Sequence, residues 1–509
     1  MNTYNVDFRE GECWYGLCAS DGVQFPLTEQ SCYSADFSVN RTTNQVCPIL
    51  ISNKGRYIYS DSCFKIDAKD GKLSISTEGA VELIEAGSNL KETFLAAAKE
   101  HFAPQRGIPP REFFETPQYN TWIELRYNQN QADVLKYAHG LIENGYPAGI
   151  LMIDDCWQKY YGCWEFEKER FPDPKGMVDE LHGLGFKVML WTCPYVSPDS
   201  SEFRYLRDKD LLTKTENGKV SLHEWWDGYS ATLDLTNPIA ILWYDMKLRS
   251  LCDKYGIDGF KFDAGDARFY ENDKLSLGMA DPNVFSELWA KFGLNYKYNE
   301  YRACVGCQGY PLVQRLADKF HSWDENGMAS LVPNTLTQGI MGYAYTCPDM
   351  IGGGEYSFFE GEGLEQRLDQ ELVVRYAQCA ALMPMMQFSV APWRVLSEEN
   401  AILCLRAARL HTQYAYYILT LAENAGKTGE PIARYMEYEF PNEGFEKVTD
   451  QFMLGDKILV APVLQKGRTT REVMLPQGRW AYLGEKMYDG GQTITVDAPI
   501  SVLPYFERR

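Results

Sequence analysis

Polar and apolar residues alternate in short runs through the first hundred positions of the chain. The stretch GRYIYSDSCFKIDAKDGKLSIST, from 55 to 77, places apolar side chains at every second position and interrupts them with Asp and Gly. Alternation with a period of two is typical of strands that bury one face, and the interruptions are typical of tight turns. The pattern predicts an N-terminal β-sandwich over residues 1–110.

A different pattern begins near residue 111, where apolar segments alternate with amphipathic helices such as QADVLKYAHGLIENGY and AILWYDMKLRSLCDKYG. Strands that alternate with helices form parallel sheets. Eight strand candidates are present, which predicts an α/β fold of the (β/α)8 TIM barrel type over residues 111–414. The strand candidates are YNTWIEL, GILMIDD, KVMLWTC, GFKFDAG, YRACVG, LVQRLAD, GYAYTC and LMPMMQFS.

The end of the chain returns to strands and turns, in DKILVAPVLQ, TREVMLPQGRW and QTITVDAPISVLPYF. This pattern predicts a C-terminal β-sandwich over residues 415–509. A doubly wound sheet is the alternative for the middle region, but no Gly-rich phosphate-binding turn follows its first strand. The barrel between two sandwiches is therefore the favoured fold.

Composition limits the class of partner. The net charge of −20 and the pI near 4.9 disfavour nucleic acids and anionic membrane surfaces, and they suit a small neutral or cationic substrate. Aromatic residues make up 14% of the chain, which fits either large cores or surfaces that stack on sugar rings. A homo-oligomer is compatible with this composition.

Cysteine usage and the N-terminal residues favour a cytoplasmic location. Fourteen Cys are scattered without paired metal-ligand spacing, which favours free buried thiols over disulfides or zinc. The first residues, MNTYNVDFREGECW, contain neither a basic region nor an apolar leader, and no apolar run approaches membrane-spanning length. No metal ion or organic cofactor is expected.

Charged and aromatic residues gather where the barrel strands are expected to end, which is where TIM-barrel enzymes place their active sites. Carboxylates and Trp residues without a His cluster are typical of a sugar site rather than a metal or acyl-transfer site. The strand-end residues are Trp122, Glu124, Asp154, Asp155, Trp157, Trp191, Asp263, Asp266, Arg302, Arg315, Asp318, Asp349, Gln387 and Trp393.

Three charged residues lie close together in GFKFDAGD, from 259 to 266. Lys261 and Asp263 are two residues apart on a strand and therefore point to the same face. A buried sheet tolerates such charges when they pair with each other or with a ligand. We therefore expect a site at this strand end, with Asp266 beyond the following turn.

Three motifs carry a family resemblance. DQFMLGDKILVAPVLQKGRTTREVMLPQGRW, KFDAGD and DKFHSWDENGMASLVPNTLTQGIMGYAYTCPDMIGGG are similar to segments of glycoside hydrolase family 31. With YNTWIEL, MIDDCW and LDLTNP, the matches extend from about residue 119 to 480. FKFDAG and PDMIGG resemble most closely the subgroup of the myogenesis-regulating glycosidase, which implies α-galactosides as substrates.

The resemblance implies a retaining mechanism, in which one ionised carboxylate attacks the anomeric carbon and a second carboxylic acid protonates the leaving oxygen. It assigns Asp263 as the nucleophile. Lys261, on the same strand face, is expected to keep Asp263 ionised by its positive charge and could also bind a sugar hydroxyl, and Asp266 is expected to be a supporting residue. Asp318 matches the acid/base position, because Trp323 follows it at the family spacing. Asp324 and Glu325 are the alternatives for the acid/base residue.

The remaining strand ends are expected to hold the sugar. The resemblance implies that Asp154 and Asp155 bind hydroxyls at C4 or C6, and MIDDCW is also similar to the Asp-Asp-Gly-Trp motif of related α-galactosidase families. Arg302 and Arg315 could hold hydroxyls or an anionic sugar. The other expected substrate-binding residues are Trp191, Trp226, Trp323, Asp349 and Trp393, and CWYG (13–16) resembles a loop that reaches the barrel mouth.

Several alternatives remain open. Within the same family the substrate could be an α-glucoside, an α-xyloside or a sulfoquinovoside. A metal-assisted enzyme of the enolase type needs carboxylate ligands on three successive strands, but Arg302 occupies one of those ends. A catalytically inactive sugar-binding protein is expected to lack one of the paired carboxylates, and both are present. The sequence therefore favours an exo-acting retaining α-glycosidase that hydrolyses small glycosides.

Overall fold

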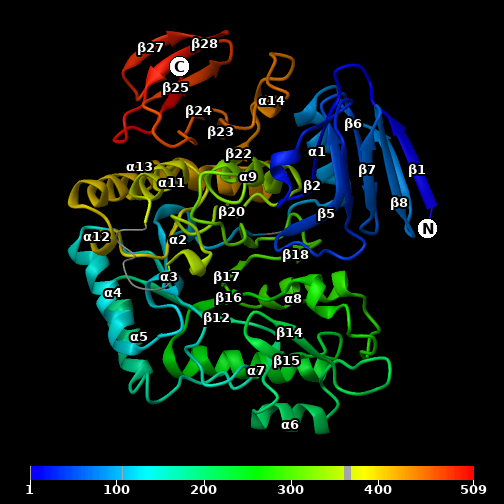
Figure 1. The fold of residues 1–509 in the computed structure, drawn as a ribbon, viewed down its shortest axis with the longest axis vertical. Helices are drawn as coiled ribbons and strands as arrows, with labels where there is room; N and C mark the ends of the chain where they lie inside the picture. Colours follow the sequence, from blue (N-terminus) through cyan, green and yellow to red (C-terminus); the bar gives the residue numbers. More distant parts are fainter. Residues whose placement is uncertain (1, 106, 360–367) are drawn as a thin grey trace.

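The computed structural model describes residues 2–105, 107–359 and 368–509. The chain forms an N-terminal β domain, a central barrel and a C-terminal β domain, and both β domains lie on the same side of the barrel (Figure 1). No described helix is long and apolar enough to cross a membrane. All fourteen Cys are free thiols, as the sequence predicts.

The N-terminal domain packs two antiparallel sheets against each other, with the strand orders β1-β8-β7-β4 and β3-β2-β5-β6-β9. Alternate residues of the strands, such as Leu73 and Ile75 of β8, point into a shared core. Its elements are β1 (Asn2–Asp7), β2 (Cys13–Cys18), β3 (Leu27–Thr28), β4 (Tyr33–Asp36), β5 (Gln45–Ser52), β6 (Arg56–Ser60), β7 (Lys65–Lys69), β8 (Lys72–Thr77), β9 (Val81–Glu85) and α1 (Leu90–His101).

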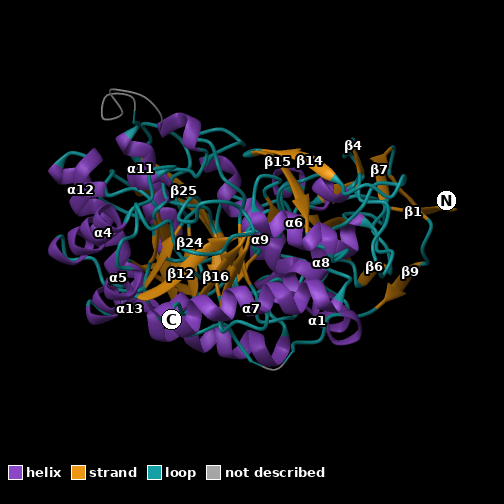
Figure 2. Cartoon of the chain, turned by 90° about the horizontal axis from the view of Figure 1, so that it is seen from below, coloured by secondary structure: helices purple, strands orange, loops and turns teal. Residues whose placement is uncertain are grey.

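Eight parallel strands form the barrel in the order β20-β19-β17-β16-β12-β11-β10-β21. The backbone N–H of Ile351 donates to the carbonyl of Gln387 at 2.8 Å and links the segment after β20 to β21, the other end strand. Figure 2 shows strands of this sheet, including β12 and β16, inside a layer of helices. The barrel strands are β10 (Gln118–Asn120), β11 (Ile150–Ile153), β12 (Lys187–Thr192), β16 (Gly259–Phe262), β17 (Tyr298–Tyr301), β19 (Val313–Arg315), β20 (Thr346–Cys347) and β21 (Gln387–Phe388).

Capped helices cover the barrel. Asn130 accepts a hydrogen bond from the backbone N–H of Asp133 at the start of α4, and Asn237 with Pro238 begins α7 in the same way. The helices are α2 (Glu112–Glu115), α3 (Trp122–Leu125), α4 (Gln131–Glu143), α5 (Pro174–Gly183), α6 (Ser201–Asp208), α7 (Pro238–Tyr255), α8 (Pro282–Gly293), α9 (Leu331–Ile340), α11 (Gln370–Ala381), α12 (Pro392–Val395) and α13 (Glu398–Thr428).

Two excursions from the barrel shape its mouth. Between β12 and α7 the chain forms a small antiparallel sheet of β13 (Tyr195–Val196), β14 (Leu222–Trp225) and β15 (Gly228–Thr232). After β17, β18 (Cys304–Val305) pairs with β5 of the N-terminal domain. The second excursion fixes the N-terminal domain beside the strand ends.

The C-terminal domain has a six-stranded sheet, β22-β23-β24-β29-β26-β27, and a two-stranded sheet, β25-β28. Val473 and Trp480 from the two sheets belong to one core cluster, so the sheets form a second sandwich. Its elements are β22 (Ala433–Arg434), α14 (Met436–Glu439), β23 (Phe452–Leu454), β24 (Ile458–Val460), β25 (Thr470–Leu475), β26 (Arg479–Tyr482), β27 (Lys486–Asp489), β28 (Gln492–Asp497) and β29 (Tyr505–Arg508).

The fold class is confirmed, but four local expectations differ from the structure. The WIEL part of the first candidate is the helix α3, because the strand ends at Asn120 and its side chain accepts from the N–H of Trp122. The fifth barrel strand is YNEY (β17), upstream of YRACVG. CWYG is the buried strand β2, with Trp14 fully buried, and so it is not a loop at the mouth. The expected boundary at residue 414 falls inside α13.

Candidate active site

A cavity of about 410 Å³ lies at the carboxyl ends of the barrel strands. Strands β11, β12, β16 and β17 each contribute side chains at or just beyond their last residue. Thr43 from the N-terminal domain and Trp226 from the β14–β15 turn complete the wall. The lining residues are Thr43, Trp122, Tyr127, Asp154, Asp155, Trp191, Trp226, Lys261, Asp263, Arg268, Arg302, Ala317, Asp318, Phe320, Glu355 and Tyr356.

Asp263 is held rigidly at the end of β16. Its carboxylate accepts hydrogen bonds from the indole of Trp191 at 2.9 Å and from Nε of Arg302 at 3.1 Å. Burial opposes ionisation, but the positive charges of Arg302 and Lys261 outweigh it and hold the pKa of Asp263 below its ordinary value. Asp263 is therefore ionised at neutral pH.

The turn after Asp263 explains why Gly265 separates the two acidic residues of this motif. A Cβ at position 265 would lie 2.4 Å from Cδ1 of Trp289, so only glycine allows this close approach. The Trp289 indole in turn donates to the backbone carbonyl of Asp263 at 3.1 Å. This packing fixes the main chain that carries the carboxylate.

Lys261 of β16 and Asp154 at the end of β11 form a buried ion pair across the end of β12, which lies between these strands. Nζ of Lys261 donates to Oδ2 of Asp154 at 2.7 Å, and both side chains are at most 5% exposed. Burial lowers the pKa of Lys261, but the charge of Asp154 more than compensates and leaves it raised. Lys261 therefore contacts Asp154 directly and acts on Asp263 through its charge.

Arg302 joins Asp263 to Asp266, which is fully buried. Its two terminal nitrogens donate to the carboxylate of Asp266 at 3.0 and 2.7 Å, and Nη1 also donates to the carbonyl of Thr43 at 2.8 Å. With the bond from Nε and a further contact of Nη2 to Asp263 at 3.0 Å, the five N–H groups of the guanidinium all face protein acceptors. Arg302 is thus a structural clamp on two carboxylates.

Asp318 is the more solvent-accessible carboxylate of the cavity, with a side chain that is 37% exposed. Oδ1 of Asp318 accepts a hydrogen bond from Arg315 at 2.9 Å, and the same nitrogen of Arg315 binds the buried Asp349. The backbone N–H groups of Lys319 and Gly354 donate to Asp349 at 2.6 and 2.7 Å. Arg315 and Asp349 therefore lie beneath the cavity and position the segment that carries Asp318.

Asp155 follows Asp154 at the end of β11 and is almost fully buried. Burial, together with the neighbouring charges of Asp154 and Asp227, raises the pKa of Asp155 to about 8. The hydroxyl of Tyr161 lies between Asp155 and Asp227 and contacts both carboxyl groups. Asp154 and Asp155 thus differ in environment although they are adjacent in the sequence.

Most expected site residues come together, although two do not. Asp154, Asp155, Trp191, Trp226, Lys261, Asp263, Arg302 and Asp318 line the cavity, and Asp266, Arg315 and Asp349 support it from below. Trp323 lies outside it, because its indole donates to Asp369 at 2.9 Å and faces the C-terminal domain. Trp393 packs against Tyr137 and Tyr146 beside α4. Asp324 is exposed and does not line the cavity.

Other residues of the site were not among the expected catalytic or substrate-binding residues. Trp122, Tyr127 and Tyr356 pack edge to face and form one aromatic wall. Trp122 carried a signal, since it stands at the first strand end, but Tyr127 and Tyr356 lie in loops. Glu300 was missed because the fifth strand was expected further along the chain; it lies buried inside the barrel and accepts from Gln387 at 2.8 Å.

Among the described residues, ligand atoms of Asp155, Cys156 and Asp227 form the one group close enough together to hold a metal ion, all within 4.8 Å of one another. The hydroxyl of Tyr161 already occupies the space between the two carboxyl groups. Hydrogen bonding therefore accounts for this cluster.

The chain is similar to known families and proteins. The model of the glycosyl hydrolases family 31 TIM-barrel domain matches residues 109–420, and that of the family's C-terminal domain matches residues 429–509. The myogenesis-regulating glycosidase of Mus musculus is 33% identical over 427 residues, which are 82% of this chain and 59% of the relative. Alpha-xylosidase XylQ of Lactiplantibacillus pentosus is 27% identical over 478 residues, which are 88% of this chain and 60% of the relative.

The chain therefore spans about 60% of the length of these two relatives. Among solved structures, a GH31 dextranase of Flavobacterium johnsoniae complexed with glucose superimposes with a TM-score of 0.88 at 23% identity, covering 99% of this chain and 66% of that one. This likeness shows a common fold. The two family models and the mouse relative, which agrees with the subgroup resemblance, show that the chain belongs to glycoside hydrolase family 31.

Proposed function

We propose that the protein is an exo-acting retaining α-glycosidase that removes terminal α-linked sugars, with α-galactosides preferred. The observation that carries the proposal is the pair of carboxyl groups in one cavity, with Asp263 ionised and buried and Asp318 open to solvent. A retaining glycosidase needs one carboxylate in each of these two roles. The cavity volume of about 410 Å³ fits a terminal sugar with part of its aglycone.

In the first half of the reaction, Asp263 attacks the anomeric carbon and forms a covalent glycosyl-enzyme. The carboxylate must be ionised, and Arg302 and Lys261 supply the positive charge that keeps it so. Its orientation is set before substrate arrives, because Trp191 and Arg302 bind both of its oxygens. The bond to the leaving oxygen breaks as the bond to Asp263 forms.

Asp318 protonates the leaving oxygen in this half and then takes a proton from the water that hydrolyses the intermediate. A group that exchanges protons with water in each turnover needs access to solvent, and the side chain of Asp318 has it. Arg315 holds one carboxyl oxygen and leaves the other for the substrate. Asp324 lacks this placement, which supports the choice of Asp318.

The sugar is held by the end of β11 and by aromatic walls. Asp154, in its ion pair with Lys261, accepts hydrogen bonds from sugar hydroxyls, and Asp155 lies beside it. Trp191 and Trp226 provide apolar faces for the ring. The preference for galactosides rests on the similarity to the myogenesis-regulating glycosidase and on the Asp-Asp motif, since axial and equatorial C4 hydroxyls need different partners.

An anionic sugar such as a sulfoquinovoside fits this cavity less well than a neutral one. Arg302 has its N–H groups directed at Asp263, Asp266 and Thr43, and Arg315 lies below the cavity. Neither arginine offers a donor to a sulfonate. Arg268 is the remaining arginine of the lining.

The substrate class is tested with the 4-nitrophenyl α-glycosides of galactose, glucose, xylose and sulfoquinovose. We expect the highest kcat/KM for the galactoside. A preference for another sugar would overturn the galactoside assignment and leave the mechanism in place. Binding of these sugars without any turnover would overturn the hydrolase itself and favour a sugar-binding protein.

A further inference from the structure

The hydroxyl of Tyr161 is shared by two carboxyl groups from different parts of the chain. It lies 3.1 and 3.0 Å from Oδ1 and Oδ2 of Asp155, and it also hydrogen-bonds to Oδ2 of Asp227. Tyr161 belongs to the loop after β11, and Asp227 lies in the β14–β15 turn beside Trp226. The contact therefore joins two walls of the cavity.

A phenol hydroxyl carries one proton and so donates one hydrogen bond at a time. If Tyr161 donates to Asp227, its oxygen faces Asp155 only as an acceptor, and Asp155 must then supply a proton. If both carboxyl groups were ionised, Tyr161 would leave one of them facing an oxygen lone pair. Two ionised carboxylates and a phenol together carry one proton at neutral pH. The contacts of Tyr161 with Asp155 and Asp227 need two protons, so one of the two carboxyl groups must be protonated.

We infer that Tyr161 and Asp227 are positioning residues that keep the Asp155 carboxyl group protonated at neutral pH, with its proton directed at Tyr161, so that a neutral carboxyl group rather than a second carboxylate faces the bound sugar. The inference rests on the proposed function, because Asp155 faces a sugar only if the cavity binds one. It assigns different charge states to neighbouring residues. Asp154 faces the sugar as a carboxylate paired with Lys261, and Asp155 faces it as a neutral carboxyl group.

The surroundings of Asp155 favour its neutral form over that of Asp227. Asp155 is 2% exposed, whereas Asp227 is exposed to solvent, and a buried carboxylate is harder to ionise. The neighbouring negative charge of Asp154 also disfavours ionisation of Asp155. These effects agree with the pKa of about 8 for Asp155. The titratable and charged groups around Asp155 are Asp154, Cys156, Tyr161, Asp227, Tyr127, Cys193, Arg170 and Lys261.

The pH dependence of kcat/KM tests the inference, measured on whichever 4-nitrophenyl glycoside is cleaved fastest. The leaving group of this substrate needs little protonation. Asp318 therefore contributes little to the alkaline limb of the pH profile, which is the decrease of kcat/KM at high pH. We expect kcat/KM of the wild type to fall as Asp155 ionises. In Asp227→Asn the limb moves to lower pH by about one unit, because a negative charge that disfavours ionisation of Asp155 is gone. An unmoved limb would overturn the inference.

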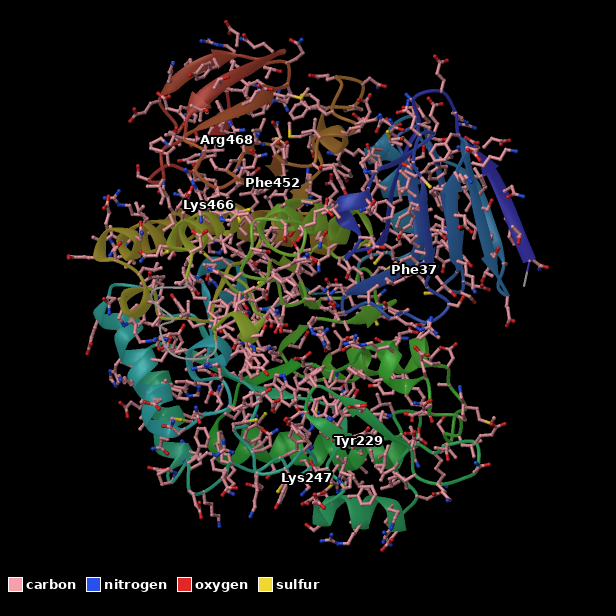
Figure 3. All side chains as sticks on the ribbon, in the orientation of Figure 1. Phe37, Tyr229, Lys247, Phe452, Lys466 and Arg468 are labelled. Atoms are coloured by element: carbon pink, nitrogen blue, oxygen red, sulfur yellow. The ribbon has the colours of Figure 1, made fainter. Side chains whose placement is uncertain are left out.

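Glu224→Gln is the matched control on the same hairpin. Glu224 accepts from Tyr229, which is 61% exposed, and Figure 3 shows Tyr229 on the side of the molecule away from Phe452 and Arg468 of the C-terminal domain. Glu224 does not contact Tyr161, so its loss leaves the limb in place. An equal shift in both variants would mean a general charge effect and would contradict the specific role of Asp227.

Substitutions of Asp155 separate a neutral side chain from an ionised one. Asn is neutral and keeps an N–H donor for Tyr161, so Asp155→Asn removes the alkaline limb and lowers kcat/KM much less than Asp155→Ala, which loses about tenfold to a hundredfold. If Asp155→Asn loses as much activity as Asp155→Ala and the limb persists, Asp155 acts as an ionised acceptor and the inference fails.

Infrared difference spectra between wild type and Asp155→Asn give a readout that needs no turnover. We expect the C=O stretch of a protonated carboxyl group at neutral pH, lost as the pH rises past about 8. In Tyr161→Phe the band moves to higher frequency, because the carboxyl group has lost its hydrogen-bond partner. Absence of the band at neutral pH overturns the protonation itself. Its presence in a protein that cleaves no glycoside upholds the protonation and refutes only the proposed function.

Discussion

Replacement of Arg302 by Met tests how far one guanidinium organises the site. Four N···O contacts between 2.7 and 3.1 Å join Arg302 to Asp263 and Asp266. The variant removes all four and leaves the fully buried Asp266 with Arg268, at 3.8 Å, as its nearest charged partner. Two carboxylates then share a buried region from which their main positive charge is missing.

The expected cost in stability is large. Removal of one partner from a buried ion pair lowers the free energy of unfolding by about 3–5 kcal/mol. For catalysis, an Arg beside an Asp lowers its pKa by roughly one to three units, so without Arg302 the pKa of Asp263 rises by about that amount. Lys261 and Arg315 remain and limit the rise.

The effect has a defined pH dependence. In the wild type the pKa of Asp263 is lower in the folded than in the unfolded state. Ionised Asp263 therefore stabilises the folded protein above the ordinary carboxyl pKa, and this stabilisation is lost as the pH falls towards the pKa of the folded state. The difference between wild type and Arg302→Met is therefore largest at neutral pH and shrinks in acid. The acidic limb of kcat/KM moves up by about one to three pH units.

Urea denaturation monitored by circular dichroism measures the stability, and 4-nitrophenyl glycoside hydrolysis measures the limb. Arg268→Met is the matched control, because Arg268 is partly exposed and lies farther from Asp266; its loss costs under about 1 kcal/mol. If Arg302→Met costs no more than Arg268→Met, or if the acidic limb stays in place, the clamp role is refuted.

Three further predictions follow from the same geometry. Asp318→Ala slows glycosides with poor leaving groups by about 100-fold or more relative to 4-nitrophenyl glycosides, whereas Asp324→Ala leaves this ratio unchanged; the opposite result would make Asp324 the acid. Trp226→Ala raises KM about tenfold with little change in kcat, while Trp393→Ala, which lies outside the cavity, leaves KM unchanged; equal effects would remove Trp226 from the substrate site. Activity survives EDTA, since carboxyl groups suffice for the mechanism; loss with rescue by Mg²⁺ would indicate metal-assisted chemistry.

The sequence predicted the fold because each barrel strand is an apolar run bounded by turns and followed by a helix. The exact positions at which the strands begin and end were harder to predict from the sequence. The Asn120 side chain ends the first strand by capping the next turn, and such local hydrogen bonds leave a weak signal in the hydrophobic pattern. The fifth strand was misplaced because its residues, YNEY, include the buried charge of Glu300. An acidic residue inside a barrel contradicts the apolar pattern that identifies strands.

Some residues of the candidate site could likewise be predicted from the sequence, and others could not. Residues at strand ends could be found, because the barrel topology itself brings Asp154, Asp263 and Arg302 together. Residues whose placement depends on a loop path could not, and these include Thr43, Tyr127 and Asp227. Trp323 and Trp393 were expected in the cavity, but an aromatic residue after a strand packs equally well against neighbouring helices or domains, as both do here.

Product analysis of Asp263→Ala in the presence of azide tests the central claim most directly. If Asp263 is the nucleophile, the variant folds like the wild type, does not turn over, and recovers cleavage of an activated glycoside when azide fills the vacated space. Azide then attacks from the side of the lost carboxylate, so nuclear magnetic resonance identifies a glycosyl azide of inverted, β configuration. An α-glycosyl azide, or a variant that keeps wild-type turnover without azide, would contradict the assignment of Asp263.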